Sequence, residues 1–358
     1  MSQHVVNRSV VRRAFKAGAV VTAALLLLAA CGSDSKPNQA AASASSSAAP
    51  RVKLTLMEPF SVSLGYVLDL TAKSRGYFEA ENLDVDIQFS RSAGQALQSL
   101  LAGQAQIVRT GVTNLVQAVS GQKAPIKSVG MTNQEVLYRL VSASTKPVKT
   151  LQELVGKTVG LPSLGGNAED VLNILLKDDG IDPGSVNRVA AGFDAAAFGL
   201  IEQGRIDALL TNVDIAATLQ QQGAAMTVAD LGDANPLLGL AYVTTNDFAA
   251  NGDAVTRFLR AIEHARRDIE DDTALDALIP KLKADWDIKV LDTPDLAKSI
   301  IKSQAENWNA AGKDQFLRNV DDRWTSGLSG LASAGVVPAN LKATDFYTNE
   351  FVDAAAGG

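Results

Sequence analysis

The chain has 358 residues, of which 46% are hydrophobic and 20% charged, a balance that excludes disorder or collagen-like repetition for most of its length. Without the five basic residues and one acid of the first 50 residues, the net charge falls from −6 to −10, so we expect no nucleic-acid partner. The only cysteine is Cys31, which excludes an intramolecular disulfide, a cysteine zinc site and a thiol nucleophile from the domain that follows it.

Residues 1–31 have the pattern of an export signal, because a basic cluster precedes a short apolar run, 17–30. The run ends in Leu28-Ala29-Ala30-Cys31, which resembles the bacterial lipobox and predicts lipidation of Cys31. The adjacent arginines Arg12-Arg13 leave the general secretory and twin-arginine routes both open. Residues 32–50 are small, polar and proline-containing, which predicts a flexible tether. We therefore expect an exported protein, lipid-anchored to a membrane of the bacterial envelope on its periplasmic or extracellular face.

From Arg51 onward, short apolar strands alternate with helical stretches. The first strands are predicted at 52–57, 85–89 and 107–109, with helices at about 64–74 and 96–101 between them. The same order follows at 157–161, 186–190 and 206–210, with helices at about 167–177 and 195–202. This alternation is typical of βαβ units and a largely parallel sheet, and its repetition predicts two α/β lobes.

An internal match supports the duplication. A shift of 101 residues places 96–106 on 197–207, Gly103 on Gly204 and Thr110 on Thr211. In each lobe we expect a helix that ends in a left-handed glycine and turns directly into a strand.

Two longer β-like runs, 135–141 and 238–244, flank the second lobe and predict two crossings about which the lobes can hinge. Helices are expected after them at 254–269, 273–284, 295–309 and 313–325, packed back on lobe one. The predicted divisions are therefore lobe one from 51 to 140, lobe two from 141 to 244 and a helical return to lobe one from 245 to 358.

Several segments together resemble the binding lipoproteins of ABC importers for sulfonates, taurine, nitrate and the thiamine pyrimidine precursor. They are 72–78 (AKSRGYF) and 82–85 (NLDV), Ala96-Leu97 with Gly103, Thr110-Gly111, 154–160 (LVGKTVG), 204–208 (GRIDA) and 244–248 (TTNDF). The resemblance implies a two-lobe periplasmic binding protein of type II, with a ligand cleft between the lobes. It also implies a small-molecule ligand, permease and ATPase partners, a monomer, and neither cofactor nor metal.

The sequence departs from that family at positions near the expected cleft. Gln106 stands where an aspartate is usual, Arg109 replaces a small residue and Val112 follows where an acid is frequent. Residues 212–214 (NVD) occupy the segment where sulfonate binders often carry tryptophan, an acid and proline. These departures leave the ligand open among sulfonate, taurine, nitrate and pyrimidine-like compounds.

Ligands of α/β sheets bind beyond the carboxyl ends of the strands, which in two-lobed proteins face the cleft. In lobe one this rule selects Phe60, Ser61, Ser92, Ala93, Gly94, Arg109, Thr110, Gly111 and Asn114. In lobe two it selects Ser163, Gly165, Gly166, Asn167, Phe193, Asp194, Asn212 and Asp214. The backbone N–H groups of 92–95 and 165–168 would begin helices and so could receive an anionic group.

Arg109 is the most specific candidate, since a guanidinium pairs bidentately with carboxylate, sulfonate or phosphate and so predicts an anionic ligand. Its structural alternative is a pair with Asp86 or Glu58. Phe60 and Phe193 could sandwich a ring or an alkyl group, or they could belong to the core. Residues 162–167 could bind ligand or be an ordinary loop and helix cap.

We therefore expect a non-catalytic solute receptor for a small, anionic ligand. One alternative is an enzyme like the thiamine-pyrimidine synthase, a chemistry for which the resemblance implies histidine and a cysteine-rich motif. The domain keeps only His264 and no cysteine. Another is a tethered sensory module without transport. The ligand, the export route, the membrane leaflet and the permease-docking surface are not specified by the sequence.

Overall fold

A computed structural model describes residues 51–134, 138–229, 231, 239–271 and 275–357. The predicted export signal with Cys31 and the predicted tether lie outside the described residues. Residues Ala49–Gly358 form one compact unit. None of the helices in the described ranges is both long and apolar enough to cross a membrane.

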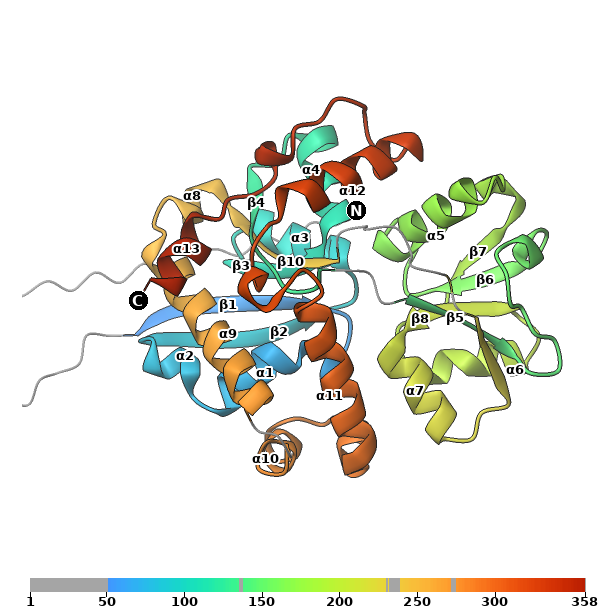
Figure 1. The fold of residues 1–358 in the computed structure, drawn as a ribbon, viewed down its shortest axis with the longest axis horizontal. Coiled ribbons are helices and arrows are strands. Elements are labelled where there is room, and N and C mark those ends of the chain that lie inside the picture. Colours follow the sequence, from blue (N-terminus) through green and yellow to red (C-terminus); the bar gives the residue numbers. More distant parts are fainter. Residues whose placement is uncertain (1–50, 135–137, 230, 232–238, 272–274, 358) are drawn as a thin grey trace, which may run out of the picture. The chain divides into compact units, whose positions relative to one another are not determined.

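The sheet of lobe one has five strands. Figure 1 labels them. They are β1 (Val52–Pro59), β2 (Leu83–Ser90), β3 (Ile107–Gly111), β4 (Ile126–Met131) and β10 (Leu240–Thr245). Their order is β2-β1-β3-β10-β4, with β1 parallel to β2 and β3 and with β10 antiparallel to β3 and β4. The helices α1 (Val67–Ser74), α2 (Tyr77–Ala80), α3 (Ala93–Leu101) and α4 (Val112–Gln122) connect these strands.

A second five-stranded sheet forms lobe two. Its strands are β5 (Tyr138–Ala143), β6 (Thr158–Leu161), β7 (Asn187–Ala190), β8 (Ala208–Asn212) and β9 (Met226–Ala229). Their order is β7-β6-β8-β5-β9, with β6 parallel to β7 and β8 and with β5 antiparallel to β8 and β9. Its helices are α5 (Asn167–Asp178), α6 (Gly199–Glu202) and α7 (Val213–Gln221).

The two sheets correspond strand by strand, which confirms the predicted repeat. β8 begins and ends 101 residues after β3, and α7 begins 101 residues after α4. Gly103 and Gly204 end equivalent helices with φ angles of 72° and 67°. A side chain at either position would be strained, because this left-handed backbone favours glycine.

Two boundaries of the predicted lobes differ from the observed ones. The predicted division places the run 238–244 in lobe two, but β10 lies in the lobe-one sheet, where Leu240 pairs with Gly111 and Tyr242 with Arg109. Lobe two also begins earlier, because β5 starts at Tyr138. Both differences have one cause: hydrogen bonding between strands, which a local apolar pattern does not reveal, decides which sheet a strand joins.

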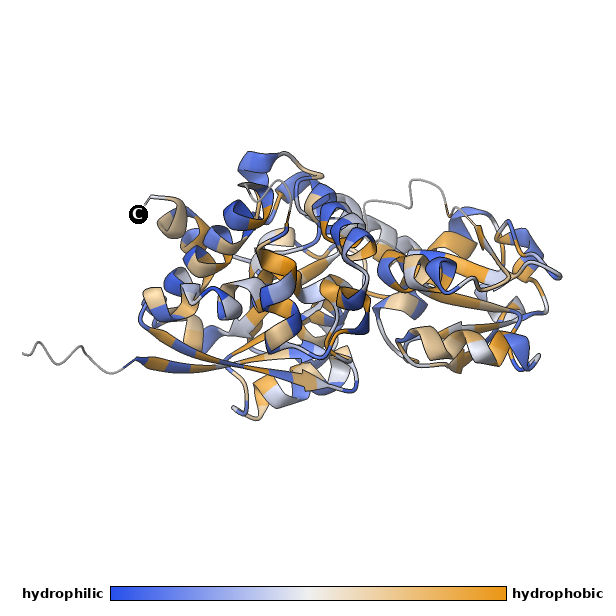
Figure 2. Cartoon of the chain, turned by 90° about the horizontal axis from the view of Figure 1, so that it is seen from below, coloured by the Kyte–Doolittle hydropathy of each residue, from blue (hydrophilic) through white to orange (hydrophobic). Residues whose placement is uncertain are grey.

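The helical return follows β10 and begins with α8 (Asn246–Ala249). Its longer helices are α9 (Asp253–Asp271), α10 (Leu278–Asp285), α11 (Pro294–Trp308), α12 (Asp321–Ser333) and α13 (Glu350–Ala356). Helices α9 to α11 pack on lobe one and bury Trp308 in the same core as β1 and α1. The predicted helix 313–325 is displaced: only a short turn occupies 313–315, and α12 starts at Asp321. Figure 2 shows that the surface helices alternate between hydrophilic and hydrophobic residues, as helices with one buried face do.

Candidate functional site

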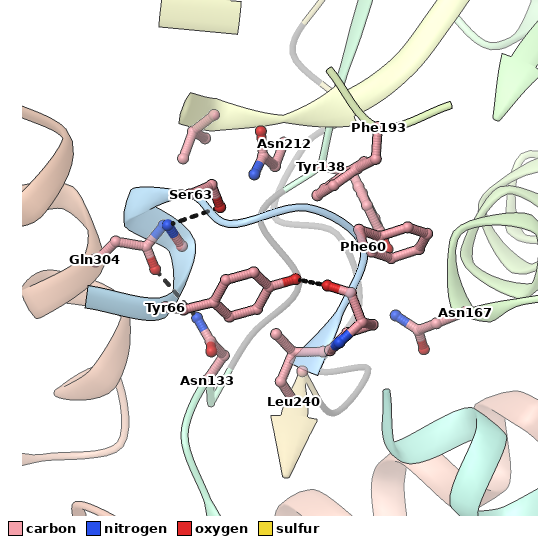
Figure 3. A pocket seen from close by; sticks show the side chains of 14 residues that line it. Phe60, Ser63, Tyr66, Asn133, Tyr138, Asn167, Phe193, Asn212, Leu240 and Gln304 are labelled. Carbon is pink, nitrogen blue, oxygen red and sulfur yellow. Dashed lines mark hydrogen bonds between the residues drawn. The ribbon is translucent and has the colours of Figure 1, made fainter. Parts of the chain in front are cut away.

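Loops at the carboxyl ends of strands in both lobes line two adjoining cavities. The first cavity is shown in Figure 3. It is lined by Pro59, Phe60, Ser63, Gly65, Tyr66, Asn133, Tyr138, Asn167, Phe193, Asn212, Val213, Gly239, Leu240 and Gln304. The second shares Pro59, Phe60, Tyr138, Asn167 and Leu240 and adds Ser92, Ala93, Gly94, Gly111, Pro162, Ser163, Leu164, Gly165, Gly166 and Ala168. Among these described residues, no side chain carries a charge.

Two phenylalanines, one from each lobe, meet at the junction of the cavities. Phe60 directly follows β1, and the centroid of its ring lies 4.8 Å from that of Phe193. Phe60 has a φ of 65°, a conformation that a bulky residue seldom adopts and that costs on the order of 1 kcal/mol or more. The strained backbone thus holds an aromatic ring at the edge of the site.

Amide side chains supply most of the polar surface of the first cavity. Asn133 and Gln304 lie on one side of it, and Asn167 lies on the other beside Phe60 (Figure 3). Asn212 accepts a hydrogen bond from the Ile215 N–H and thereby caps α7. The Oδ1 atom of Asn167 is buried without a protein partner, so a ligand N–H or O–H would satisfy it.

The second cavity lies at the beginnings of α3 and α5, as the strand-end rule predicts. At α3 the Ser92 hydroxyl accepts a hydrogen bond from the Gln95 N–H. At α5 the preceding Gly166 offers no side-chain cap, and the Glu169 carboxylate accepts a hydrogen bond from the Gly165 N–H at 2.6 Å. This carboxylate, which also lies 3.5 Å from Arg188, already occupies the first turn of α5, where a ligand anion would otherwise bind.

Arg109 does not line either cavity. Its side chain is 0% exposed, and Nη1 donates to Asp69 Oδ2 at 3.1 Å while Nε donates to Thr132 Oγ1 at 3.0 Å. The structural alternative is therefore favoured, but the ion pair is with Asp69 and not with Asp86 or Glu58, although the Glu58 carboxyl also lies near the guanidinium. Asp86 is exposed and instead accepts a hydrogen bond from Gln88.

Two buried carboxyl groups, those of Glu58 and Asp69, lie around Arg109. Glu58 is 0% exposed, and burial, reinforced by the Asp69 charge, raises its pKa well above the ordinary value. Asp69 pairs with Arg109 and accepts a hydrogen bond from the Tyr242 hydroxyl. The Arg109 guanidinium is thus already paired within the protein, which leaves it less able to attract an anion into the cavity.

Two glutamine–aspartate pairs are among the contacts between the lobes. Gln304 of α11 donates to Asp214 of α7 at 3.1 and 3.2 Å, and Gln117 of α4 donates to Asp170 of α5 at 3.2 Å. Burial raises the pKa of each aspartate to about 6. Near these pairs, Gly111 approaches Asn167 so closely that a Cβ atom on the glycine would lie 2.7 Å from Asn167 Cβ.

The structure brings together many of the predicted site residues but not all. Those that line a cavity are Phe60, Ser92, Ala93, Gly94, Gly111, Ser163, Gly165, Gly166, Asn167, Phe193 and Asn212. Those that line neither are Ser61, Arg109, Thr110, Asn114, Asp194 and Asp214. Ser61 and Asp194 are exposed, and Asp194 caps the turn at Ala195–Phe198. Thr110 and Asn114 are buried, and Asp214 lies behind Gln304.

Sequence reasoning missed several lining residues, among them Tyr66, Asn133, Tyr138 and Gln304. Asn133 lies shortly after β4, so the strand-end rule would have found it had that strand been predicted. Gln304 had no such signal, because it comes from a helix late in the chain. Among the described residues, no group of three or more His, Cys, Asp or Glu side chains could hold a metal ion.

Comparison with known proteins identifies relatives that are binding proteins. A riboflavin-binding protein of Chloroflexus aurantiacus, RibY, is 24% identical over 321 residues, which cover 85% of this chain and 88% of RibY. A formylaminopyrimidine-binding protein of Halalkalibacterium halodurans is 29% identical over 139 residues, which cover 39% of this chain and 41% of that protein.

The fold also matches a solved structure. The periplasmic nitrate-binding protein NrtA of Synechocystis PCC 6803 superposes with a TM-score of 0.69 at 13% identity, covering 86% of this chain and 89% of NrtA. The two-lobe fold is thus that of the periplasmic binding proteins. The family model described as NMT1/THI5 like matches residues 66–272, more than half of the chain. The chain therefore belongs to the NMT1/THI5-like family.

Proposed function

We propose that this protein is the solute-binding component of an ABC importer and that its solute contains an uncharged, planar heteroaromatic ring. The observation that carries this proposal is the lining of the first cavity, which combines phenylalanine and tyrosine rings with amide side chains and, among the described residues, has no charged side chain. Aromatic rings stack on planar ligands, and amides hydrogen-bond to their polar edges.

An anionic solute, which Arg109 led us to expect, fits this lining less well. The Arg109 guanidinium is enclosed and paired with Asp69, and the Glu169 carboxylate occupies the first turn of α5. An anion in the cavity would lose its hydration without meeting a free cation among the described lining residues. Nitrate, sulfonates and taurine are therefore less suitable ligands than a neutral ring.

The printed names of two relatives support a ring ligand. They are a riboflavin-binding and a formylaminopyrimidine-binding protein, and riboflavin and pyrimidines both contain planar heteroaromatic rings. The identities of these relatives are 24% and 29%, so their names suggest a class of ligand for this chain and not a compound.

Calorimetric titration of the purified protein with riboflavin, a 4-aminopyrimidine, taurine and nitrate tests the proposal. We expect binding of a ring compound and none of taurine or nitrate. Phe193→Leu should lower the affinity for the ring compound by about three- to tenfold, the effect expected for the loss of one aromatic contact. The control Phe248→Leu changes a half-buried ring of lobe one outside both cavities and should keep wild-type affinity. Binding of taurine or nitrate without either ring compound would refute the ring assignment.

Closure of the two lobes around the solute is the mechanism we propose for capture. The lobes share the cavities and meet at the pairs Gln304–Asp214 and Gln117–Asp170, so a ligand that contacts both lobes binds the closed arrangement more tightly than an open one. Small-angle scattering should show a smaller radius of gyration at saturation with the ring compound. An unchanged radius would count against closure.

Membrane anchoring through Cys31 remains part of the proposal, supported by the sequence Leu28-Ala29-Ala30-Cys31. Cys31→Ser should abolish lipidation and leave unprocessed precursor, as judged by mass spectrometry of membrane fractions. Normal cleavage after Ala30 in this variant would rule out the lipobox.

Import, and not catalysis, is the role we propose. His264, the domain's only histidine, is exposed on α9 and lines neither cavity. A pyrimidine-synthase-like reaction would lack the histidine that the resemblance implies for it. Adjacent genes for a permease and an ATPase would support transport over a sensory role, and a monomer is expected in solution.

A further inference from the structure

Asn133 and Gln304 stand side by side on one wall of the first cavity. Asn133 Nδ2 lies 3.5 Å from Gln304 Oε1, and Figure 3 shows both groups facing each other beside Tyr66. The two ends of an amide are alike in size but opposite in hydrogen bonding, so an amide in a pocket can present either a donor or an acceptor. Which end each of these amides presents depends on what lies behind it.

The hydrogen bond from Arg109 fixes the orientation of the side-chain amide of Asn133. The Arg109 Nη2 atom donates to Asn133 Oδ1 at 2.7 Å, and a guanidinium has no acceptor that could hold the NH₂ end instead. Arg109 is itself held by Asp69 and Thr132, and all of these side chains are buried. Asn133 must therefore turn its NH₂ group away from Arg109 and toward Gln304 and the cavity.

The carboxylate of Asp214 fixes the orientation of the side-chain amide of Gln304. The Gln304 Nε2 atom lies 3.1 and 3.2 Å from the two carboxylate oxygens of Asp214. An ionised carboxylate only accepts hydrogen bonds, so it binds the NH₂ end of the glutamine. The carbonyl oxygen of Gln304 is thereby turned toward Asn133.

Resting on the proposed function, we propose that Asn133 and Gln304 form a donor–acceptor pair that selects a ring edge with an acceptor beside a donor, as in a lactam or imide. Asn133 Nδ2 carries a second hydrogen and Gln304 Oε1 a second lone pair, and their mutual contact is long. Arg109 and Asp214 are the positioning residues. A ligand without the donor would leave the buried Gln304 oxygen poorly paired.

Neutron diffraction of the ligand-free protein after deuterium exchange tests the orientation directly, because it distinguishes ND₂ from oxygen. We expect ND₂ of Asn133 to face Gln304 and ND₂ of Gln304 to face Asp214. The opposite orientation of either amide would overturn the inference whichever ligand the protein binds.

Calorimetry with riboflavin and 3-methylriboflavin tests the selection. Riboflavin carries an N–H between two carbonyl groups, and the methyl group removes that donor. The wild-type protein should bind riboflavin about tenfold or more tightly than the methylated compound, the loss expected for an unpaired buried acceptor. Asp214→Asn, which frees Gln304 to turn, should reduce this ratio to below about threefold.

Asp170→Asn is the matched control, because it makes the same change of charge in the other glutamine–aspartate pair, outside both cavities. It should keep the wild-type ratio. Equal binding of both flavins by the wild-type protein, or equal loss of the ratio in both variants, would refute the selection. If the wild-type protein binds neither flavin, the ring proposal loses its support for this ligand, and the neutron result still decides the orientation of the pair.

Discussion

The two lobes place different side chains at the same point of one backbone plan. Arg109 on β3 corresponds to Leu210 on β8, 101 residues later, and both are 0% exposed. Leu210 packs in an apolar core, whereas Arg109 joins Asp69, Thr132 and Asn133. The comparison teaches that lobe two uses this position for packing alone, and lobe one uses it to orient a side chain of the cavity.

The largest effect is expected when Arg109 of lobe one is replaced by leucine, the residue that lobe two has at the equivalent position, Leu210. Arg109→Leu leaves Asp69 buried without its cation, so we expect a loss of about 3–5 kcal/mol in the free energy of unfolding, measured by urea titration. Leu210→Met, which keeps the volume of the apolar counterpart, should cost less than about 1.5 kcal/mol. An Arg109→Leu variant as stable as the wild-type protein would show that the ion pair is dispensable.

Two acids of lobe two, Asp214 and Asp170, should make the stability of the protein depend on pH. Burial raises the pKa of Asp214 from 3.8 to about 6, against the opposing influence of Gln304 and Arg109. The folded state therefore binds more protons than the unfolded state between these values, and this acid's contribution to stability falls as the pH rises through that window. The free energy of unfolding of Asp214→Asn, relative to that of the wild-type protein, should therefore rise by about 1–3 kcal/mol from pH 4 to pH 7.

Urea titrations at several pH values measure this gain. Asp170→Asn should behave alike, because burial and the Glu169 charge raise the pKa of Asp170 to about 6. Asp247→Asn, at an exposed residue of α8, serves as the control for the change of charge alone. A stability difference between Asp214→Asn and wild type that does not change with pH would contradict the assignment.

Gly111 and Asn212 occupy equivalent positions in the two lobes but have different structural roles. Gly111 leaves room for Asn167, whereas Asn212 caps α7 and lines the first cavity. Gly111→Ala would push Asn167 and the start of α5 away, so ring-ligand affinity should fall by about tenfold, the effect of about 1.4 kcal/mol. In calorimetry, Gly121→Ala on α4, outside both cavities, should bind normally, since an added Cβ would meet nothing within 4 Å. Equal affinity of both variants would show that close approach of the lobes is not required.

The smallest effect concerns the two facing phenylalanines. Phe60 has a φ of 65°, and Phe193 does not share that positive angle. Phe60→Gly should relieve backbone strain and change the free energy of unfolding by no more than about 1 kcal/mol. It should also lower the affinity for the ring ligand. Chemical denaturation and calorimetry together separate the two effects, and a large loss of stability would show that the ring serves the core.

Several elements were predictable because their signals are local. The glycines Gly103 and Gly204 and the apolar runs between them identified the repeat, since helix ends and strands depend on neighbouring residues. The strand-end rule located Phe60, Asn167 and Phe193 in the cavities for the same reason. The strand at 238–244 was placed in the wrong lobe, because its partners β3 and β4 lie more than 100 residues earlier.

By itself, the sequence determined the two α/β lobes, their duplication and the edge of the sheets where the cavities lie, because periodicity and glycine positions act over short distances. Only the tertiary structure decided the role of Arg109. A guanidinium at a strand end can pair with a ligand or with a protein carboxylate, and the choice depends on Asp69 reaching it from α1. Gln304 likewise became a cavity residue through the packing of α11 against α7. Charge pairing and packing between distant segments are set by three-dimensional proximity, which no local pattern encodes.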